Sequence, residues 1–164
     1  IFNFNSGEEA FEGELTEDKF VKFYSTDHCP ARLNISYNFS LPNSKHPTDI
    51  ATGFKGNVYP KKINHWGSIV NLPDWKTVFF VRNCSHNPKK TESGDLDFTF
   101  FDNTNSIEKH VHVKAETCTI LEFEMNTDFS DFVSWKCNSS VGTIEVFWVC
   151  FNEETGAICG DHSF

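Results

Sequence analysis

Apolar and polar side chains alternate along most of this chain. In residues 31–40, ARLNISYNFS, every second position is apolar, namely Leu33, Ile35, Tyr37 and Phe39, and polar residues fall between them. A period of two places one set of side chains on a buried face and the other set on a wet face. This segment is therefore predicted to be a β-strand that covers a core.

Similar segments recur at short intervals, separated by turn residues. We predict strands at residues 18–25, 31–40, 52–59, 66–72, 75–84, 95–101, 107–116, 117–125, 131–137 and 143–151. Residues 41–49 are predicted to be a loop, residues 153–164 a tail, and residues 1–17 a lead-in with a short helix that ends near Gly13. Many short strands with almost no helical periodicity predict one all-β antiparallel domain over residues 1–164, either a barrel or a sandwich.

Phenylalanine is unusually frequent, at 18 of 164 residues. So many rings must either fill a β core or line an apolar cavity. The formal net charge of −9 argues against nucleic acid or an anionic membrane as the partner, and suits either solubility or attraction of cationic ligands and basic proteins. No apolar run approaches the roughly 18 residues of a membrane-spanning helix, so membrane insertion is not expected.

Sequons and cysteines indicate an extracellular protein. N-glycosylation sequons begin at four asparagines, Asn34, Asn38, Asn83 and Asn138. The six cysteines are an even number with no C-x-x-C pair: Cys29, Cys84, Cys118, Cys137, Cys150 and Cys159. Together these features predict a secreted, glycosylated and disulfide-bonded protein.

No catalytic motif accompanies these features. The chain has no G-x-S-x-G, no H-E-x-x-H and no glycine-rich phosphate loop. His110 and His112 point to the same side of a predicted strand, but two imidazoles without a third ligand are more typical of a protein surface than of a metal site. We therefore expect neither an enzyme nor a cofactor.

A resemblance to a known family is carried by the C-terminal part of the chain. Residues 127–137, TDFSDFVSWKC, resemble the lipocalin signature T-D-Y-x-x-Y-A…C. Residues 145–149, EVFWV, are similar to the last barrel strand of that family, and residues 118–123, CTILEF, to a strand of lipocalins from blood-feeding arthropods, especially ticks. The usual G-x-W triplet is missing, as it commonly is in tick lipocalins. The resemblance implies an eight-stranded antiparallel barrel; the alternative is an unrelated β-sandwich.

The aromatic positions of the predicted strands form the candidate ligand site. In a barrel they would together line a cavity for one small ligand, although for any single ring a place in a filled core is the better interpretation. These candidates are Phe80, Phe98, Phe100, Leu121, Phe123, Trp135 and Trp148. Carboxylates on the same strands would bind a cationic amine if they pointed inward and would only be solvated if they pointed outward. The carboxylate candidates are Asp97, Glu122, Glu124 and Glu145.

The resemblance implies a secreted, monomeric carrier. It would sequester a small hydrophobic molecule, such as a sterol, fatty acid or eicosanoid, and thereby modulate host inflammation or immunity. One alternative is a scavenger of a biogenic amine such as histamine or serotonin. Another is a secreted β-sandwich that binds a host cytokine, chemokine or receptor without an internal ligand. The resemblance also implies a Cys118–Cys137 disulfide, and a bridge from Cys29 to Cys150 or Cys159 that leaves the other one for Cys84.

Overall fold

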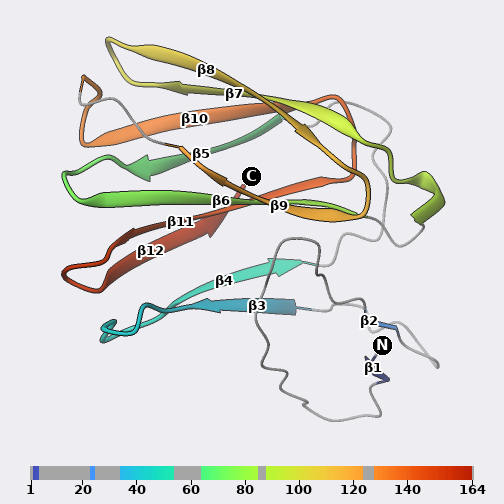
Figure 1. The fold of residues 1–164 in the computed structure, drawn as a ribbon, viewed down its shortest axis with the longest axis horizontal. Helices are drawn as coiled ribbons and strands as arrows, with labels where there is room; N and C mark the ends of the chain where they lie inside the picture. The colour runs from blue at the N-terminus through green and yellow to red at the C-terminus, as the bar shows by residue number, and fades with distance from the viewer. Residues whose placement is uncertain are drawn as a thin grey trace.

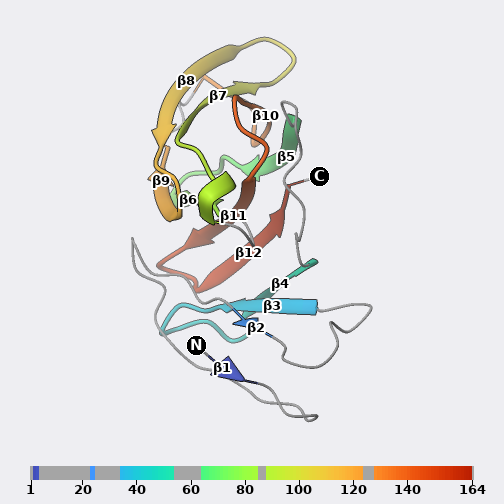
Figure 2. The ribbon, with the colours of Figure 1, turned by 90° about the vertical axis from the view of Figure 1, so that its right-hand side faces the viewer.

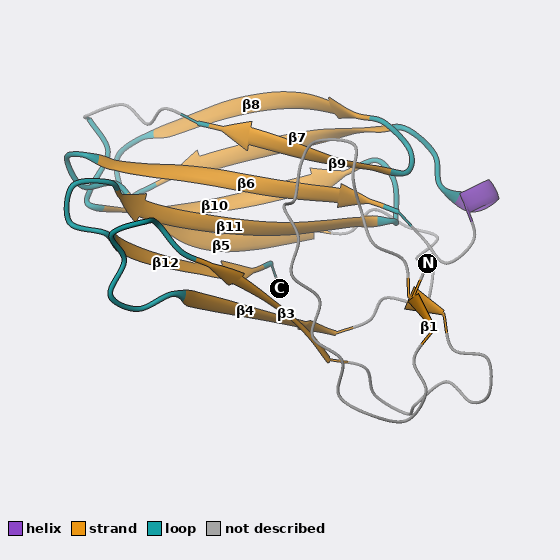
Figure 3. Ribbon diagram, turned by 60° about the horizontal axis from the view of Figure 1, so that its bottom comes forward, coloured by secondary structure: helices purple, strands orange, loops and turns teal. Residues whose placement is uncertain are grey.

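The computed structural model describes residues 2–3, 23–24, 34–53, 64–84, 88–123 and 128–163. Within these ranges the protein consists of β-strands and one short 3-10 helix, Pro88–Lys90 (Figures 1 and 3). The strands are β1 (Phe2–Asn3), β2 (Phe23–Tyr24), β3 (Asn34–Phe39), β4 (Thr48–Gly53), β5 (Asn64–Val70), β6 (Trp75–Asn83), β7 (Gly94–Phe101), β8 (Ser106–Val113), β9 (Thr117–Glu122), β10 (Phe132–Ser139), β11 (Ile144–Asn152) and β12 (Ala157–His162).

Eight of these strands form two four-stranded antiparallel sheets. The strand order is β5-β10-β7-β8 in the first sheet and β12-β11-β6-β9 in the second sheet. The β3–β4 hairpin adds a further layer beside β12, and β1 pairs with β2 in parallel (Figure 2). Because β5, β8, β9 and β12 are sheet edges, the described strands form no closed barrel. The arrangement is compatible with the sandwich alternative.

The two sheets enclose one core. It contains the inward side chains of alternating positions from both sheets, as the period of two requires. Its fully buried members include Phe79 and Val81 from the second sheet and Phe98, Phe100 and Trp135 from the first. Along one side of the sandwich, the short turn from β8 to β9 connects the first sheet to the second. On the opposite side, His65 Nδ1 of β5 lies 2.7 Å from Ser163 Oγ, just beyond β12.

Strand β11 is buried on both faces. Ile144, Val146 and Trp148 contribute to the core between the sheets, whereas Phe147 and Val149 point the other way and pack with Ile50 of the β3–β4 hairpin. The hairpin also makes polar contacts with the turn after β11. Asn43 Nδ2 donates to the Glu153 carbonyl at 2.9 Å, and Ser44 Oγ donates to the Gly156 carbonyl at 2.8 Å. Together these contacts fix the hairpin to the second sheet.

The predicted strands agree with the structure wherever the apolar alternation is strong. Strands β3, β6, β7, β10 and β11 lie where they are predicted, with ends that differ by a few residues. Two predictions are wrong: the loop at residues 41–49 already contains the start of β4, and the tail at residues 153–164 contains β12. The helix in residues 1–17 and most of the strand at 18–25 lie outside the described residues.

Two phenylalanines offer a matched test of the core. Phe98 is fully buried between the sheets, whereas Phe132 is 68% exposed. We expect Phe98→Ala to lower the free energy of unfolding by about 3–5 kcal/mol, because it removes a packed ring and leaves a cavity. Phe132→Ala should change it by about 0.5 kcal/mol or less. Urea denaturation followed by tryptophan fluorescence measures both; equal losses would contradict the assigned core.

Candidate functional site

The interior of the sandwich is filled by aromatic rings that touch one another. Phe79 meets Trp135 edge-on with ring centroids 5.1 Å apart, and Phe98 stacks on Phe100 at 5.9 Å. Phe123 closes the cluster, with its centroid 4.9 Å from that of Phe100. Centroid distances of 4.5–7 Å are those of packed aromatic pairs. The rings therefore occupy the interior as neighbours rather than as the separated walls of a cavity.

The packing continues to the β5 side of the interior. Trp148 lies edge-on to Trp135, with centroids 5.1 Å apart. Gly67 faces both indoles: a Cβ at this position would lie 2.5 Å from Trp148 Cη2 and 2.9 Å from Trp135 Nε1. Because contacts below 3.0 Å require movement, any larger residue here would force the two indoles to shift. The two tryptophans thus fill the space between β5 and β11.

Six of the seven predicted ligand-binding side chains share this interior. Phe98, Phe100, Trp135 and Trp148 are buried in it, and Leu121 and Phe123 pack against it. Phe80 is the exception, because the structure does not place it with the other six. It follows the inward-facing Phe79, so its side chain points to the opposite face of β6 and packs against Phe39 at 5.2 Å.

None of the predicted amine-binding carboxylates that the structure describes faces these rings. Asp97 lies on the solvent side of the first sheet and Glu122 is exposed on β9. Glu145 is buried, but it lies on the hairpin side of β11, where it forms an ion pair with Arg82. An inward carboxylate beside the rings is therefore not found among these three, and Glu124 lies outside the described residues.

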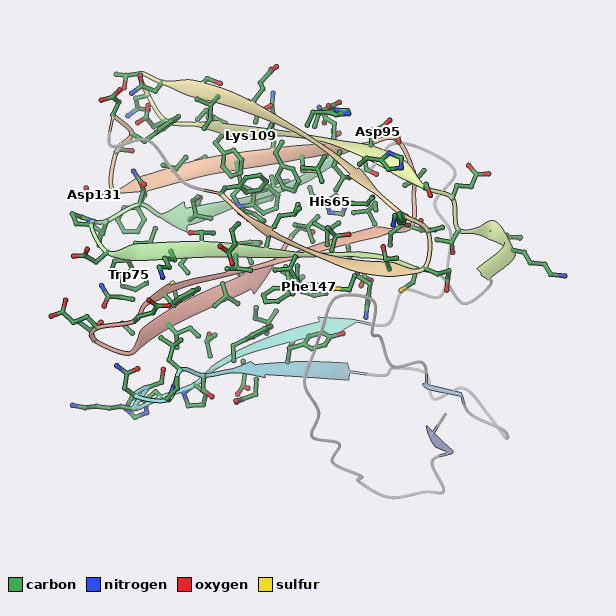
Figure 4. All side chains as sticks on the ribbon, viewed as in Figure 1. His65, Trp75, Asp95, Lys109, Asp131 and Phe147 are labelled. Carbon is green, nitrogen blue, oxygen red and sulfur yellow. The ribbon has the colours of Figure 1, made fainter. Side chains whose placement is uncertain are left out.

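A polar cluster missed by the sequence reasoning lies under the β3–β4 hairpin. Arg82 Nη2 contacts Glu145, Arg82 Nη1 donates to Tyr37 Oη at 2.9 Å, and the guanidinium lies 5.7 Å from the centre of the Phe147 ring. Figure 4 shows Phe147 between the second sheet and the hairpin. Burial raises the pKa of Tyr37, and the Arg82 charge opposes that rise. Arg82 is two residues after Phe80 on the same strand, so the two side chains share the outward face of β6. This spacing is the feature of the sequence that could have predicted the position of Arg82.

The solvent side of the first sheet carries exposed aromatic side chains. Trp66 is 57% exposed, Phe132 68% and Phe101 38%. Their positions follow from the register of the sheet. Ser134 of β10 lies opposite Phe101 of β7 on one side and Ser68 of β5 on the other. Also between β10 and β5, Phe132 is opposite Val70 and Lys136 is opposite Trp66. The three rings therefore surround Ser134 on one face. We call Trp66, Phe101 and Phe132 the aromatic face.

Two histidine–aspartate pairs lie on the same side of the sheet, across β7 and β8. His110 Nδ1 is 2.7 Å from Asp97, and His112 Nδ1 is 2.7 Å from Asp95. Figure 4 labels Asp95 at this end of the molecule. The hydrogen bond with Asp97 raises the pKa of His110. No group of three His, Cys, Asp or Glu side chains placed to hold a metal ion occurs in the described part of the chain.

The sequon asparagines differ in accessibility. Asn38 and Asn138 are exposed on β3 and β10, and Asn34 begins β3. Asn83 is fully buried, and its amide nitrogen donates to the carbonyls of Glu92 at 2.9 Å and Lys114 at 3.0 Å. A glycan on that nitrogen would replace one of its two N–H donors, so at least one of these hydrogen bonds would be lost, and the buried nitrogen has no access to solvent. The folded structure therefore accommodates a glycan at Asn38 and Asn138 but not at Asn83.

The cysteine positions do not support the pairing that the resemblance implies. Cys137 is fully buried in the core of the first sheet, and burial raises the pKa of its thiol to about 12. Cys118 lies opposite Arg82, on the outward side of β9, so its side chain points away from Cys137. The second sheet separates the two, and a Cys118–Cys137 disulfide does not fit this fold. Cys29 lies outside the described residues.

Comparison of the chain with protein-family models, curated proteins and solved structures finds no match. None of the helical structure in the described residues is long and apolar enough to span a membrane. The candidate site therefore rests on the geometry of this chain alone.

The His110–Asp97 pair gives a pH-dependent prediction. Because Asp97 raises the pKa of His110, the folded state binds that proton more tightly than the unfolded state. The stabilising contribution is fully present below the ordinary histidine pKa and is lost as the pH rises through the raised one. We expect Asp97→Asn to move the pKa of His110 back towards its ordinary value in an NMR titration. Asp49→Asn on β4 is the control; an unmoved His110 in the Asp97 variant would contradict the pairing.

Proposed function

We propose that this chain is a secreted binding protein that binds a basic extracellular protein through the aromatic face of the first sheet. The observation that carries the proposal is the contrast between the two sides of that sheet. Its inner side chains are packed ring against ring, whereas its outer side presents Trp66, Phe101 and Phe132 to solvent. Tryptophan, tyrosine and phenylalanine are enriched at protein–protein interfaces, and contiguous exposed apolar groups mark such sites.

The surroundings of the aromatic face suit a protein partner. Small polar side chains, Ser68 and Ser134, lie between the rings, and Lys136 lies beside Trp66. Interfaces commonly combine a few large apolar anchors with a polar rim, and the anchors supply most of the binding free energy. An uncovered sheet face with this composition favours a protein surface over a small molecule, which needs a concave site.

The overall charge selects the kind of partner. The formal net charge of −9 attracts basic proteins and speeds their encounter. The proposed partners are cytokines, chemokines or their receptors. Their extracellular location agrees with the sequons and cysteines of the chain. The sequon at Asn138 lies on the same side of β10, six residues from Phe132. At about 3.4 Å per residue the two are about 20 Å apart, whereas Trp66, the register partner of Lys136, lies only two strand positions from Asn138, so a glycan there would lie beside the Trp66 end of the aromatic face.

The alternative is the small-molecule carrier that the lipocalin resemblance implies. It would need an eight-stranded barrel with an open interior, and therefore displacement of the rings around Trp135. The contacts among Phe79, Phe98, Phe100 and Phe123 weigh against that arrangement. The amine-scavenger variant would also need a carboxylate beside the rings, and Glu145 is instead engaged by Arg82.

The test uses a panel of purified basic chemokines and cytokines with the immobilised full chain. We expect at least one member to bind, and the Trp66→Ser/Phe101→Ser/Phe132→Ser variant to weaken that binding by about 100-fold or more, because aromatic anchors each contribute on the order of 2 kcal/mol. Biolayer interferometry measures the dissociation constants. Unchanged affinity in the folded triple variant would contradict the aromatic face as the site.

A matched control is Lys76→Ala. Lys76 of β6 pairs with Glu153 in the turn after β11, and both side chains are 61% exposed. Exposed ion pairs contribute little to stability, so this variant should fold normally and keep its affinity. Sedimentation of the free protein completes the test, since a dimer that the triple variant abolishes would assign the aromatic face to a second copy of the chain instead.

A further inference from the structure

Two cysteines of the C-terminal hairpin lie directly opposite each other. In the antiparallel pairing of β11 with β12, Cys150 is the register partner of Cys159. Side chains of directly opposed residues project from the same side of the sheet. Both thiols therefore leave the hairpin on the side that faces the sandwich core, where Cys150 is 1% exposed. Cys159 is on the edge strand and remains accessible to solvent.

The spacing of opposed strand residues suits a disulfide. Directly paired residues of antiparallel strands have Cα atoms about 4.5 or 5.5 Å apart. Disulfide-bonded cysteines usually have Cα atoms about 4.4–6.8 Å apart, so the register alone brings this pair within range. No other two cysteines of the described residues are register partners.

The two thiols also interact directly. The Cys150 sulfur accepts hydrogen bonds from the Cys159 thiol and from Thr77 Oγ1, the latter at 3.3 Å. These bonds lower the pKa of Cys150 to about 7, and the same contact with Cys150 raises the pKa of Cys159. A sulfur that carries thiolate character near neutral pH, in contact with a second thiol, is placed to complete a disulfide.

We propose that Cys150 and Cys159 form a disulfide that fastens β12 to β11. The oxidant is an external disulfide such as oxidised glutathione. The accessible Cys159 thiol passes its proton to the Cys150 thiolate as it attacks one glutathione sulfur; the glutathione S–S bond breaks, and the first glutathione thiolate leaves and takes that proton from Cys150. Cys150 thiolate then attacks the Cys159 sulfur, the mixed S–S bond breaks, and the second glutathione thiolate leaves. The two protons lost by the cysteines end on the two glutathiones, so two thiols are oxidised and one disulfide is reduced.

This bond would support more than one hairpin. Strand β12 contacts β4, and the turn between β11 and β12 accepts the hydrogen bonds of Asn43 and Ser44. Fixing β12 therefore also fixes the edge on which the β3–β4 hairpin rests. The inference does not depend on the proposed binding function, because it concerns the side of the molecule remote from the aromatic face.

Peptide mapping of the full chain tests the pairing. The protein is refolded in a glutathione redox buffer, blocked with N-ethylmaleimide and cleaved after glutamate without reduction. Cleavage after Glu145, Glu153 and Glu154 separates the two cysteines from each other and from Cys137. We expect residues 146–153 to be covalently joined to residues 155–164. A maleimide adduct on both peptides, or a link from either one to another cysteine, would overturn the proposal.

Two variants extend the test. In Cys159→Ala, Cys150 loses its partner and should become labelled by maleimide after denaturation; an unlabelled Cys150 would contradict the pairing. In Cys150→Ala/Cys159→Ala, we expect the unfolding equilibrium constant to rise about 100-fold, because a loop of about ten residues is no longer closed in the unfolded chain. An unchanged constant would contradict a disulfide in the wild-type protein.

Discussion

The double burial of β11 is the constraint on which the rest of the structure depends. This strand lies between β12 and β6, and every one of its residues except Phe151 is buried. One face contributes Trp148 to the core between the sheets, and the other carries Phe147 and Val149 under the β3–β4 hairpin. A charged residue in such a strand must be paired, because an uncompensated buried charge is costly. Glu145 is paired with Arg82, which is held in turn by Tyr37. The β3–β4 hairpin and the polar cluster under it are therefore consequences of the burial of β11 on both of its faces.

The way in which each sheet is covered also explains why we propose a binding site on the surface of the protein and not in its interior. The first sheet has one covered side, and that side is occupied by contacts among Phe98, Phe100 and Trp135. Its other side has no covering layer among the described residues, yet it carries Trp66 and Phe132 with more than half of each side chain exposed. Large apolar side chains in water are unfavourable unless something binds them, and a partner protein would remove that cost. The core and the proposed binding face are then the two sides of the first sheet.

The alternation of apolar and polar residues predicts much of this fold, but only where burial on one side is strong. It places β3, β6, β7, β10 and β11, and it brings six of the seven predicted ring and leucine positions together. It misses β12, whose sequence AICGDH is short and largely small or polar, because this strand is formed through pairing with β11 and contact with β4. It also misplaces Phe80, since adjacent phenylalanines on one strand cannot share a face. The directions of Asp97 and Glu145 depend on register and on the hairpin layer, which no local pattern contains.

We propose that aromatic rings fill the interior between the two described sheets and that binding takes place on the aromatic face instead. Native mass spectrometry of the protein, purified from a secreting host without organic solvent and treated to remove glycans, tests this claim most directly. The account predicts the mass of the polypeptide alone, and no stoichiometric adduct after incubation with a fatty acid, a sterol or histamine. A small molecule bound one to one, and released on denaturation, would contradict it.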